Sequence, residues 1–385
     1  MTVANSLNEI IYADNAATTR LDEDALTLMF DLQKNFFANP SSAYKLSRPL
    51  KKILRESREK IAACINAEPH EIIFTSGGTE SDNQAIKSLV LENLSERPHI
   101  ITSAVEHKAV LNSCAAMKRL GCNVTILPVD PRGAVDPFDL QKMILPQTKI
   151  ISIMLANNEV GTIQPIKILA DIAHSAGKIF HTDAVQALGH IPVDVKNLGV
   201  DMLSASAHKF NGPKGIGFLY IRDGLNVLPY IDGGAQEFSK RAGTENVPAI
   251  AAMALALEKN CRDMESNAEK MSACADIVLD RLRSGGINFI VNGGENRLPG
   301  HLSLSFKGLN GETVMHRLDL KNICVSTGSA CNSNRTEISH VSRALNVRED
   351  YIRGTIRITF GKENSHADAE IIGDRLTGLL RAFDE

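Results

Sequence analysis

The chain of 385 residues contains no tryptophan, and aromatic residues make up only 5% of it. It has no long basic run, and its formal net charge is only -3. The sequence therefore lacks both a surface that neutralises phosphates and aromatic platforms on which bases could stack. We expect no direct nucleic-acid substrate.

Long hydrophobic runs are also missing. No apolar stretch approaches the roughly 20 residues needed to span a bilayer. Residues 1–12 lack the basic region and the sustained apolar region of a signal peptide. We therefore expect no membrane partner, and the cytoplasm is the simplest location.

The cysteines form no C-x-x-C pair. Seven are present, at positions 64, 114, 122, 261, 274, 324 and 331. Their odd number and scattered spacing fit neither a disulfide framework nor a zinc site, so we expect no metal. Most of them are expected to be small buried hydrophobic residues.

What is present is ordinary globular composition, with 43% hydrophobic and 23% charged residues, in a chain long enough for a large domain and a smaller companion. From about residue 48 to 260, helical patterns alternate with short β-branched runs at 71–75, 99–103, 124–128, 149–155, 178–182 and 215–221. This alternation predicts parallel strands with crossover helices in a doubly wound α/β domain. Ligands of such sheets bind beyond the carboxyl ends of the strands.

The second half of the chain changes character. After Val247 the sequence predicts a long helix, with room for one interruption, that ends at two glycines. Further strand-like and helical segments follow up to about Phe383. We predict a large domain over residues 16–258 and a smaller α+β domain formed by residues 1–15 and 259–385.

The strongest local motif is SASAHKFNGPKGIG at 204–217, in which lysines flank a glycine-rich turn before an apolar strand. A lysine there can act as a Schiff-base nucleophile if desolvation or a neighbouring cation lowers its pKa from about 10. Lys209 and Lys214 are both candidates. A solvated loop is the alternative interpretation of this motif alone.

A second motif, TSGGTESDNQAIK at 75–87, predicts a strand end that opens into a helix. Gly78 lets the backbone approach an anion, the helix amino end faces it, and Thr79 adds a hydroxyl donor. The pattern matches neither dinucleotide-binding nor P-loop sequences, so a nucleotide is not implied. An ordinary helix cap would look similar.

Two further motifs follow predicted strands. Asp183, in HTDAVQALG at 181–189, could hold a pyridine nitrogen protonated, which makes pyridoxal phosphate an electron sink. His107, in SAVEHKAV at 103–110, could stack on a flat ring or move protons. A capping aspartate and a surface histidine are the alternatives.

Taken together, the motifs resemble the cysteine desulfurases, in particular the class I branch that serves iron–sulfur assembly and thiolation. The resemblance keeps order and spacing over nearly the whole chain. It rests on DNAATT (14–19), NPSS (39–42), FTSGGTESDN (74–83), EH (106–107), NNEVGTIQP (157–165), TDAVQ (182–186), SAHKFNGPKG (206–215), RAGTEN (241–246), RLPG (297–300), STGSAC (326–331) and IRITFG (356–361).

This resemblance implies a fold-type I transferase that depends on pyridoxal 5′-phosphate, with Lys209 as its Schiff-base lysine and Lys214 as structural. The other implied cofactor contacts are Thr79, Gly78, Ser206 and His208 at the phosphate, Asp183 at the pyridine nitrogen, Gln186 near the ring hydroxyl, and His107 stacked on the ring as acid and base. Asn158 and Arg357 would hold the substrate carboxylate, for which a guanidinium fork is suited. Thr244 would reach the phosphate of a neighbouring subunit, which implies a homodimer.

The resemblance also makes Cys331 the thiol that takes sulfur from L-cysteine, leaves alanine and passes the sulfur to an acceptor protein. The surrounding sequence, 326–340, is small and polar, whereas Cys324 lies in an apolar run. Iron–sulfur assembly, tRNA thiolation and DNA phosphorothioation remain open as pathways. A selenocysteine lyase, another fold-type I aminotransferase and an inactive scaffold are the rival functions.

The chain departs from the usual wording of the family at Tyr44, Ser47 and Ile338, where His, Gly and Pro are frequent. Ala235 and the stretch 238–246 also differ from the usual glycine-rich wording. None of these departures removes a predicted catalytic group.

Overall fold

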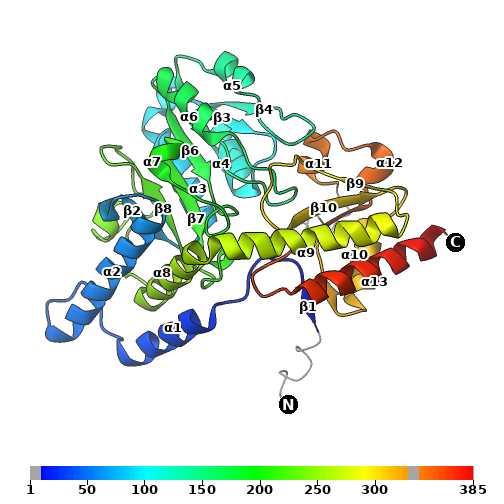
Figure 1. Cartoon of the computed structure of the whole chain (residues 1–385). Helices are drawn as coiled ribbons and strands as arrows, with labels where there is room; N and C mark the ends of the chain where they lie inside the picture. Colours follow the sequence, from blue (N-terminus) through cyan, green and yellow to red (C-terminus); the bar gives the residue numbers. More distant parts are fainter. Residues whose placement is uncertain (1–9, 328–337, 385) are drawn as a thin grey trace.

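The computed structural model describes residues 10–327 and 338–384 (Figure 1). Its larger sheet has the strand order β2-β8-β7-β6-β5-β3-β4. The strands are β2 (Ile72–Thr75), β3 (His99–Ser103), β4 (Asn123–Leu127), β5 (Thr148–Ser152), β6 (Ile179–Asp183), β7 (Met202–Ser206) and β8 (Gly217–Ile221). The predicted α/β class with a mostly parallel sheet is confirmed.

Two details of the sequence prediction are wrong. Strand β7 was not predicted, because Ser204, Ala205 and Ser206 give it small and polar side chains in place of a β-branched run. Strand β8 is antiparallel to both of its neighbours. Only residues 207–216 separate it from β7, and a parallel return needs a crossover of a dozen or more residues.

Both faces of this sheet are buried. One face, which includes Ile100 and Leu219, packs with residues of α3 and α4 such as Ile86 and Val110. The other face packs with residues of α2, α6 and α8. These helices are α2 (Arg48–Cys64), α3 (Gly78–Ser88), α4 (Lys108–Arg119), α6 (Ile166–Ser175) and α8 (Val247–Arg262). The mostly apolar strands therefore have the burial expected of a doubly covered sheet.

A separate hydrophobic cluster surrounds a small antiparallel sheet of order β12-β10-β9. Its elements are β9 (Phe289–Val291), β10 (His301–Phe306), β12 (Thr355–Thr359), α9 (Met264–Ser284), α10 (Gly311–Asp319) and α13 (His366–Asp384). Strand β1 (Ile11–Tyr12) pairs with β11 (Ile323–Cys324) beside it. The predicted long helix is confirmed as α8 and α9, interrupted at Asp263. The division into domains at residue 258 stays a prediction.

The remaining helices are α1 (Glu23–Asn35), α5 (Pro137–Met143), α7 (Val195–Leu198), α11 (His340–Ala344) and α12 (Glu349–Ile352). Over the described residues, every helix is too short or too polar to cross a bilayer.

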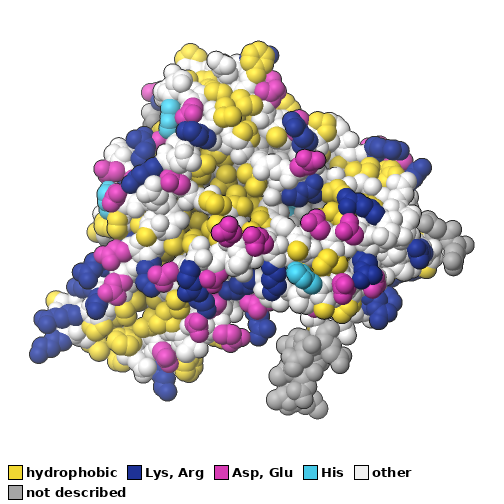
Figure 2. Space-filling view, in the orientation of Figure 1, with side chains coloured by type: hydrophobic (Ala, Val, Ile, Leu, Met, Phe, Trp, Pro, Cys, Tyr) yellow, Lys and Arg dark blue, Asp and Glu magenta, His cyan; other side chains and the backbone are white. Residues whose placement is uncertain are grey.

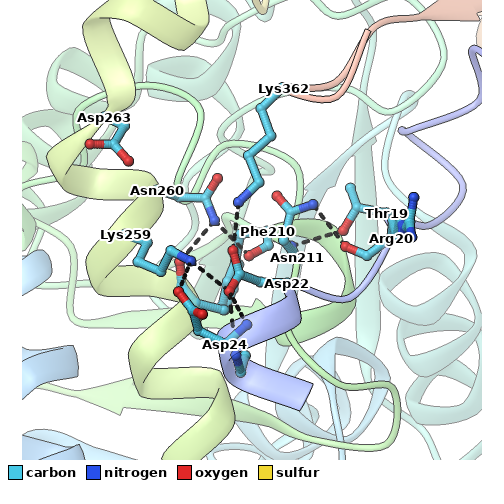
Figure 3. A network of polar contacts seen from close by, with 12 residues as sticks. Thr19, Arg20, Asp22, Asp24, Phe210, Asn211, Lys259, Asn260, Asp263 and Lys362 are labelled. Atoms are coloured by element: carbon cyan, nitrogen blue, oxygen red, sulfur yellow. Dashed lines mark hydrogen bonds and ion pairs between the residues drawn. The ribbon is translucent and has the colours of Figure 1, made fainter. Parts of the chain in front are cut away.

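An ion-pair network joins the start of α1 to the end of α8 and to Lys362 (Figure 3). The Asp22 carboxylate lies 2.7 Å from Lys259 Nζ and 3.0 Å from Lys362 Nζ. It also caps α1 by accepting the N–H groups of Asp24 and Ala25. Burial raises the pKa of Asp22, but the hydrogen bonds from both lysines outweigh burial and lower it to about 2.

We expect Asp22→Asn to lower the free energy of unfolding by about 1–3 kcal/mol near neutral pH, because it leaves the partly buried Lys362 without its anion and Lys259 with only the exposed Asp24. The depressed pKa means that this stabilisation is present above the unfolded value of about 4 and is lost as the pH falls toward about 2. Urea unfolding of both proteins near neutral pH and in acid measures the difference.

Glu23→Gln is the matched control, since the Arg20–Glu23 pair beside the network is solvent-exposed. It should change the free energy of unfolding by no more than about 0.5 kcal/mol. Equal losses for the two variants would contradict the role given to Asp22.

Candidate active site

A cavity of about 380 Å³ opens at the carboxyl ends of β6 and β7, where sheets of this type bind ligands. Asp183 and Ser206 are the last residues of these strands. The lining residues are Ala16, Ala17, Gly78, Thr79, Asp82, His107, Met154, Asn158, Asp183, Val185, Gln186, Ser206, His208, Lys209 and Arg357.

Most of the residues predicted from the sequence thus meet in one cavity. Between the two candidate lysines, Lys209 lines this cavity and Lys214 lines a different one beside α1. Thr244 is exposed and is not among the residues that line the cavity. Cys331 lies outside the described residues.

The Lys209 side chain is directed by the backbone of residues 16 and 17. Its Nζ donates hydrogen bonds to the carbonyl oxygens of Ala16 at 2.6 Å and Ala17 at 2.8 Å. Gln186 Nε2 donates to the same Ala16 carbonyl at 2.9 Å. These bonds keep the amine among carbonyl acceptors inside the cavity.

The loop after Lys209 is tied to α8 and to the segment before α1 (Figure 3). Asn260 Nδ2 donates to the Phe210 carbonyl at 2.9 Å, and the Asn211 N–H donates to Thr19 Oγ1 at 2.8 Å. Both elements therefore fix the backbone that carries Lys209.

The amino end of α3 forms a narrow cradle against β7. A Cβ atom at Gly78 would lie 2.6 Å from Val185 Cγ2, and Gly77 has a left-handed φ of 146°. Ser206 borders the same two glycines, and Thr79 is the second helical residue. Unpaired N–H groups, two hydroxyls and space for backbone approach together suit an anion such as a phosphate.

Both His208 and His107 have lowered pKa values. Burial and the nearby lysines, above all Lys209, lower the pKa of His208 to about 4. Burial also lowers the pKa of His107, although Asp183 opposes this shift. His107 Nδ1 accepts the Ala109 N–H at 3.2 Å, which leaves Nε2 as the nitrogen able to exchange a proton.

Asp183 is fully inside the protein. Burial raises its pKa, while His107, the Val185 N–H and Lys209 act in the opposite direction. The Val185 N–H donates to Asp183 Oδ1 at 2.9 Å. A cationic partner at the other oxygen would complete the stabilisation of the ionised carboxylate.

Arg357 holds two partners already. Its Nη2 lies 2.6 Å from Asp14 Oδ1, and its Nη1 donates to the Asn158 carbonyl at 2.9 Å. Its buried Nε has no hydrogen-bond partner among the described residues. The guanidinium is therefore fixed in the cavity wall, and its Nε–H is still available to a ligand.

Two buried carboxyl groups of the site were not predicted from the sequence. Asp82 lines the cavity from α3, three residues after Thr79, and this helical spacing was the signal that could have revealed it. Glu106 accepts hydrogen bonds from the Ser103 hydroxyl at 2.6 Å and the Met154 N–H at 2.9 Å. Burial raises the pKa of Glu106 to about 8.

The departures from the usual family wording lie away from the cavity lining. Ser47 is buried, and its hydroxyl donates to the Asn39 carbonyl at 2.7 Å. Tyr44 is exposed, and Ile338 is half-buried. Ser47 thus bridges the NPSS segment to the start of α2.

Fold and site together define a class-V aminotransferase, and the chain matches that family over residues 11–372. It is 46% identical to a cysteine desulfurase IscS of Dictyoglomus turgidum, over 96% of this chain and 94% of that protein. It is 43% identical to a cysteine desulfurase IscS of Methanosarcina thermophila, over 94% and 90% of the two chains. The chain belongs to the cysteine desulfurase family.

Solved structures agree. A structure described as a NifS-like protein superposes with a TM-score of 0.91 at 36% identity, over 97% of this chain and all of that one. Another, described as SspA in complex with cysteine, has a TM-score of 0.82 at 36% identity, over 91% of this chain and 99% of that one.

Proposed function

We propose that this chain binds pyridoxal 5′-phosphate and converts L-cysteine to L-alanine, with the sulfur retained as a persulfide on Cys331. The observation that carries the proposal is the convergence of Lys209 and Asp183 in one cavity with the phosphate cradle at Gly78. An amine, a carboxylate and an anion site are the three groups that this cofactor requires of a protein.

The residues present fit the cofactor. The cradle at Gly78, with Thr79 and Ser206, would hold the phosphate, and His208 would border it. Asp183 would meet the pyridine nitrogen, whose positive charge would stabilise the buried carboxylate. Gln186 would lie near the ring hydroxyl and His107 over the ring. When bound, the cofactor withdraws the electrons released at the substrate α-carbon.

The side chains of the chain divide the remaining work. Lys209 Nζ would hold the cofactor covalently and would then move the proton of the substrate α-carbon. Arg357 would bind the substrate carboxylate through guanidinium N–H groups that its two partners leave available, with Asn158 beside it. His107 would act as acid and base for the substrate thiol.

The sulfur step uses Cys331. Its thiolate attacks the substrate sulfur, the substrate C–S bond breaks, and an S–S bond forms on the enzyme. L-Cysteine and one thiol thus become L-alanine and one persulfide, with all atoms retained. The terminal sulfur then passes to an acceptor protein, whose pathway stays open between iron–sulfur assembly, tRNA thiolation and DNA phosphorothioation.

We also propose a homodimer in which Thr244 of the partner subunit reaches the phosphate. Thr244 lies outside its own cavity lining and is exposed, which is what a contribution to a second copy requires. Nearby, Leu26 and Phe30 of α1 are exposed and line a groove with Asn246, Pro248 and Ala249. Figure 2 shows hydrophobic side chains gathered over the region of α1, α2 and α8. Such apolar surface favours association.

We expect the unaltered chain to sediment with the mass of two chains. Thr244→Ala should bind pyridoxal phosphate about tenfold more weakly, since one hydrogen bond to a charged group is lost. Thr313→Ala, on α10, is the matched control and should keep the affinity of the unaltered chain. A monomer with full affinity would contradict the shared site.

The experiment that tests the activity measures alanine and sulfide released from L-cysteine by the purified chain in the presence of a reductant. Stoichiometric alanine and sulfide support a desulfurase. Pyruvate and ammonia, or alanine only when a keto acid is supplied, would contradict it. Parallel assays with L-selenocysteine separate a selenocysteine lyase, which the named relatives do not favour.

A further inference from the structure

The cavity contains two fully buried carboxyl groups where the cofactor requires one. Ligand atoms of Asp82, Asp183 and His107 lie within 4.8 Å of one another. Asp82 is 1% exposed and Asp183 is 4% exposed. Two like charges at this distance, away from water, oppose each other strongly, so the pair favours one negative charge.

The surroundings decide which member keeps the charge. Asp183 accepts the Val185 N–H and faces His107 and Lys209, which all favour its ionised form. Asp82 faces the carboxyl group of Asp183, whose negative charge disfavours the ionised form of Asp82. Burial acts in the same direction and is the main reason why the pKa of Asp82 is raised well above its ordinary value.

Hydrogen bonding at Asp82 agrees with this assignment. Its Oδ1 is buried and has no hydrogen-bond partner within the described ranges 10–327 and 338–384. An ionised carboxylate with a bare oxygen would lose its hydration without replacement. The Ser204 hydroxyl favours the anion by a hydrogen bond to the Asp82 carboxyl.

Ser204 belongs to a chain of neutral groups behind Asp82. Ser204 Oγ lies 2.9 Å from His181 Nε2, and Ser152 Oγ lies 2.8 Å from His181 Nδ1. Burial lowers the pKa of His181 to about 3, so this imidazole is neutral. These hydrogen-bonded groups therefore supply no cation that could pair with Asp82.

The titratable groups that face Asp82 are Asp183 and His181 of β6, Glu106 and His107 before α4, and Cys114 of α4.

We propose that Asp82 is the neutral, proton-holding member of the carboxyl pair, and that it acts as a positioning residue that keeps Asp183 as the single anion beneath the cofactor ring. A second anion there would make the ring nitrogen more basic than one carboxylate does. This proposal rests on the cofactor site proposed above, but its charge assignment concerns the protein alone.

The first test compares Asp82→Asn with the unaltered holoenzyme through the pH midpoint of the visible absorbance of the bound cofactor. Asparagine replaces a neutral carboxyl by a neutral amide of the same shape, so the midpoint should stay within about 0.3 pH unit. Loss of a true anion within 5 Å would shift the midpoint by about one unit or more toward lower pH, and this result would overturn the proposal.

The second test does not depend on activity. Infrared spectra of the chain, grown with isotope-labelled aspartate, should contain the C=O band of a protonated aspartic acid near neutral pH, and this band should be missing from Asp82→Asn. The label excludes Glu106, whose protonated form would otherwise contribute. Absence of a protonated aspartate band sinks the proposal.

The failure of the two proposals can be told apart. A colourless protein that makes no alanine refutes the proposed function, whereas the infrared band would still assign the charge of Asp82. A yellow, active enzyme with only ionised aspartates refutes the inference alone. Glu71→Gln serves as the control for the absorbance test, because it changes a buried carboxyl that lines a different cavity.

Discussion

Lys209→Ala is expected to reduce alanine formation from L-cysteine by about 10³-fold or more, because it removes both the covalent anchor of the cofactor and the base at the α-carbon. The yellow colour of the covalently bound cofactor should disappear after desalting. Absorbance spectra and single-turnover alanine assays measure the two effects. An added primary amine could restore part of the rate, since the cavity left by the side chain is open to small molecules.

Lys214→Ala is the matched control for this prediction. Lys214 lies five positions later in the same glycine-rich segment, and it lines a separate groove with Pro213 and residues of α1. We expect colour and alanine formation close to those of the unaltered chain. If the two variants reversed these results, the covalent lysine would have to be reassigned.

The candidate site could be predicted from the sequence where its residues come directly after strands. Asp183 ends β6, and His107 follows β3 by a short turn, so the strand pattern alone placed both at one edge of the sheet. The choice between Lys209 and Lys214 could not be made from the pattern, because both follow β7. Only the fold directs Lys209 Nζ to the Ala16 carbonyl, which comes from a segment 193 residues away.

Long-range pairing explains what the sequence did not predict. Arg357 was predicted, but its ion pair with Asp14 spans 343 residues of chain, and no local periodicity encodes such a pair. Asp82 lies in the motif at 75–87, but its burial against Asp183 depends on how α3 packs on β6 and β7. Strand β7 was missed for a related reason. Ser204 and Ser206 contribute hydroxyl groups to the polar site, and they lack the β-branched or aromatic side chains that indicate a strand.

Cys331→Ala is expected to abolish persulfide formation and to lower alanine formation by at least about 10³-fold, as for the loss of a covalent nucleophile. The cofactor should still bind, so the yellow colour remains and separates this variant from Lys209→Ala. Cys331→Ser should be equally inactive, because a hydroxyl cannot accept the sulfur. Persulfide is measured by alkylation and mass spectrometry after one turnover.

Cys324→Ala is the control for the thiol, since Cys324 is a half-buried residue of β11 and burial raises its pKa. A thiol that resists ionisation is a poor nucleophile, so this variant should form persulfide at the unaltered rate. Alanine formation that survives in Cys331→Ala would favour a lyase or a transaminase, because neither reaction needs a protein thiol. Loss of alanine in Cys331→Ala together with its retention in Cys324→Ala would assign the sulfur step to Cys331.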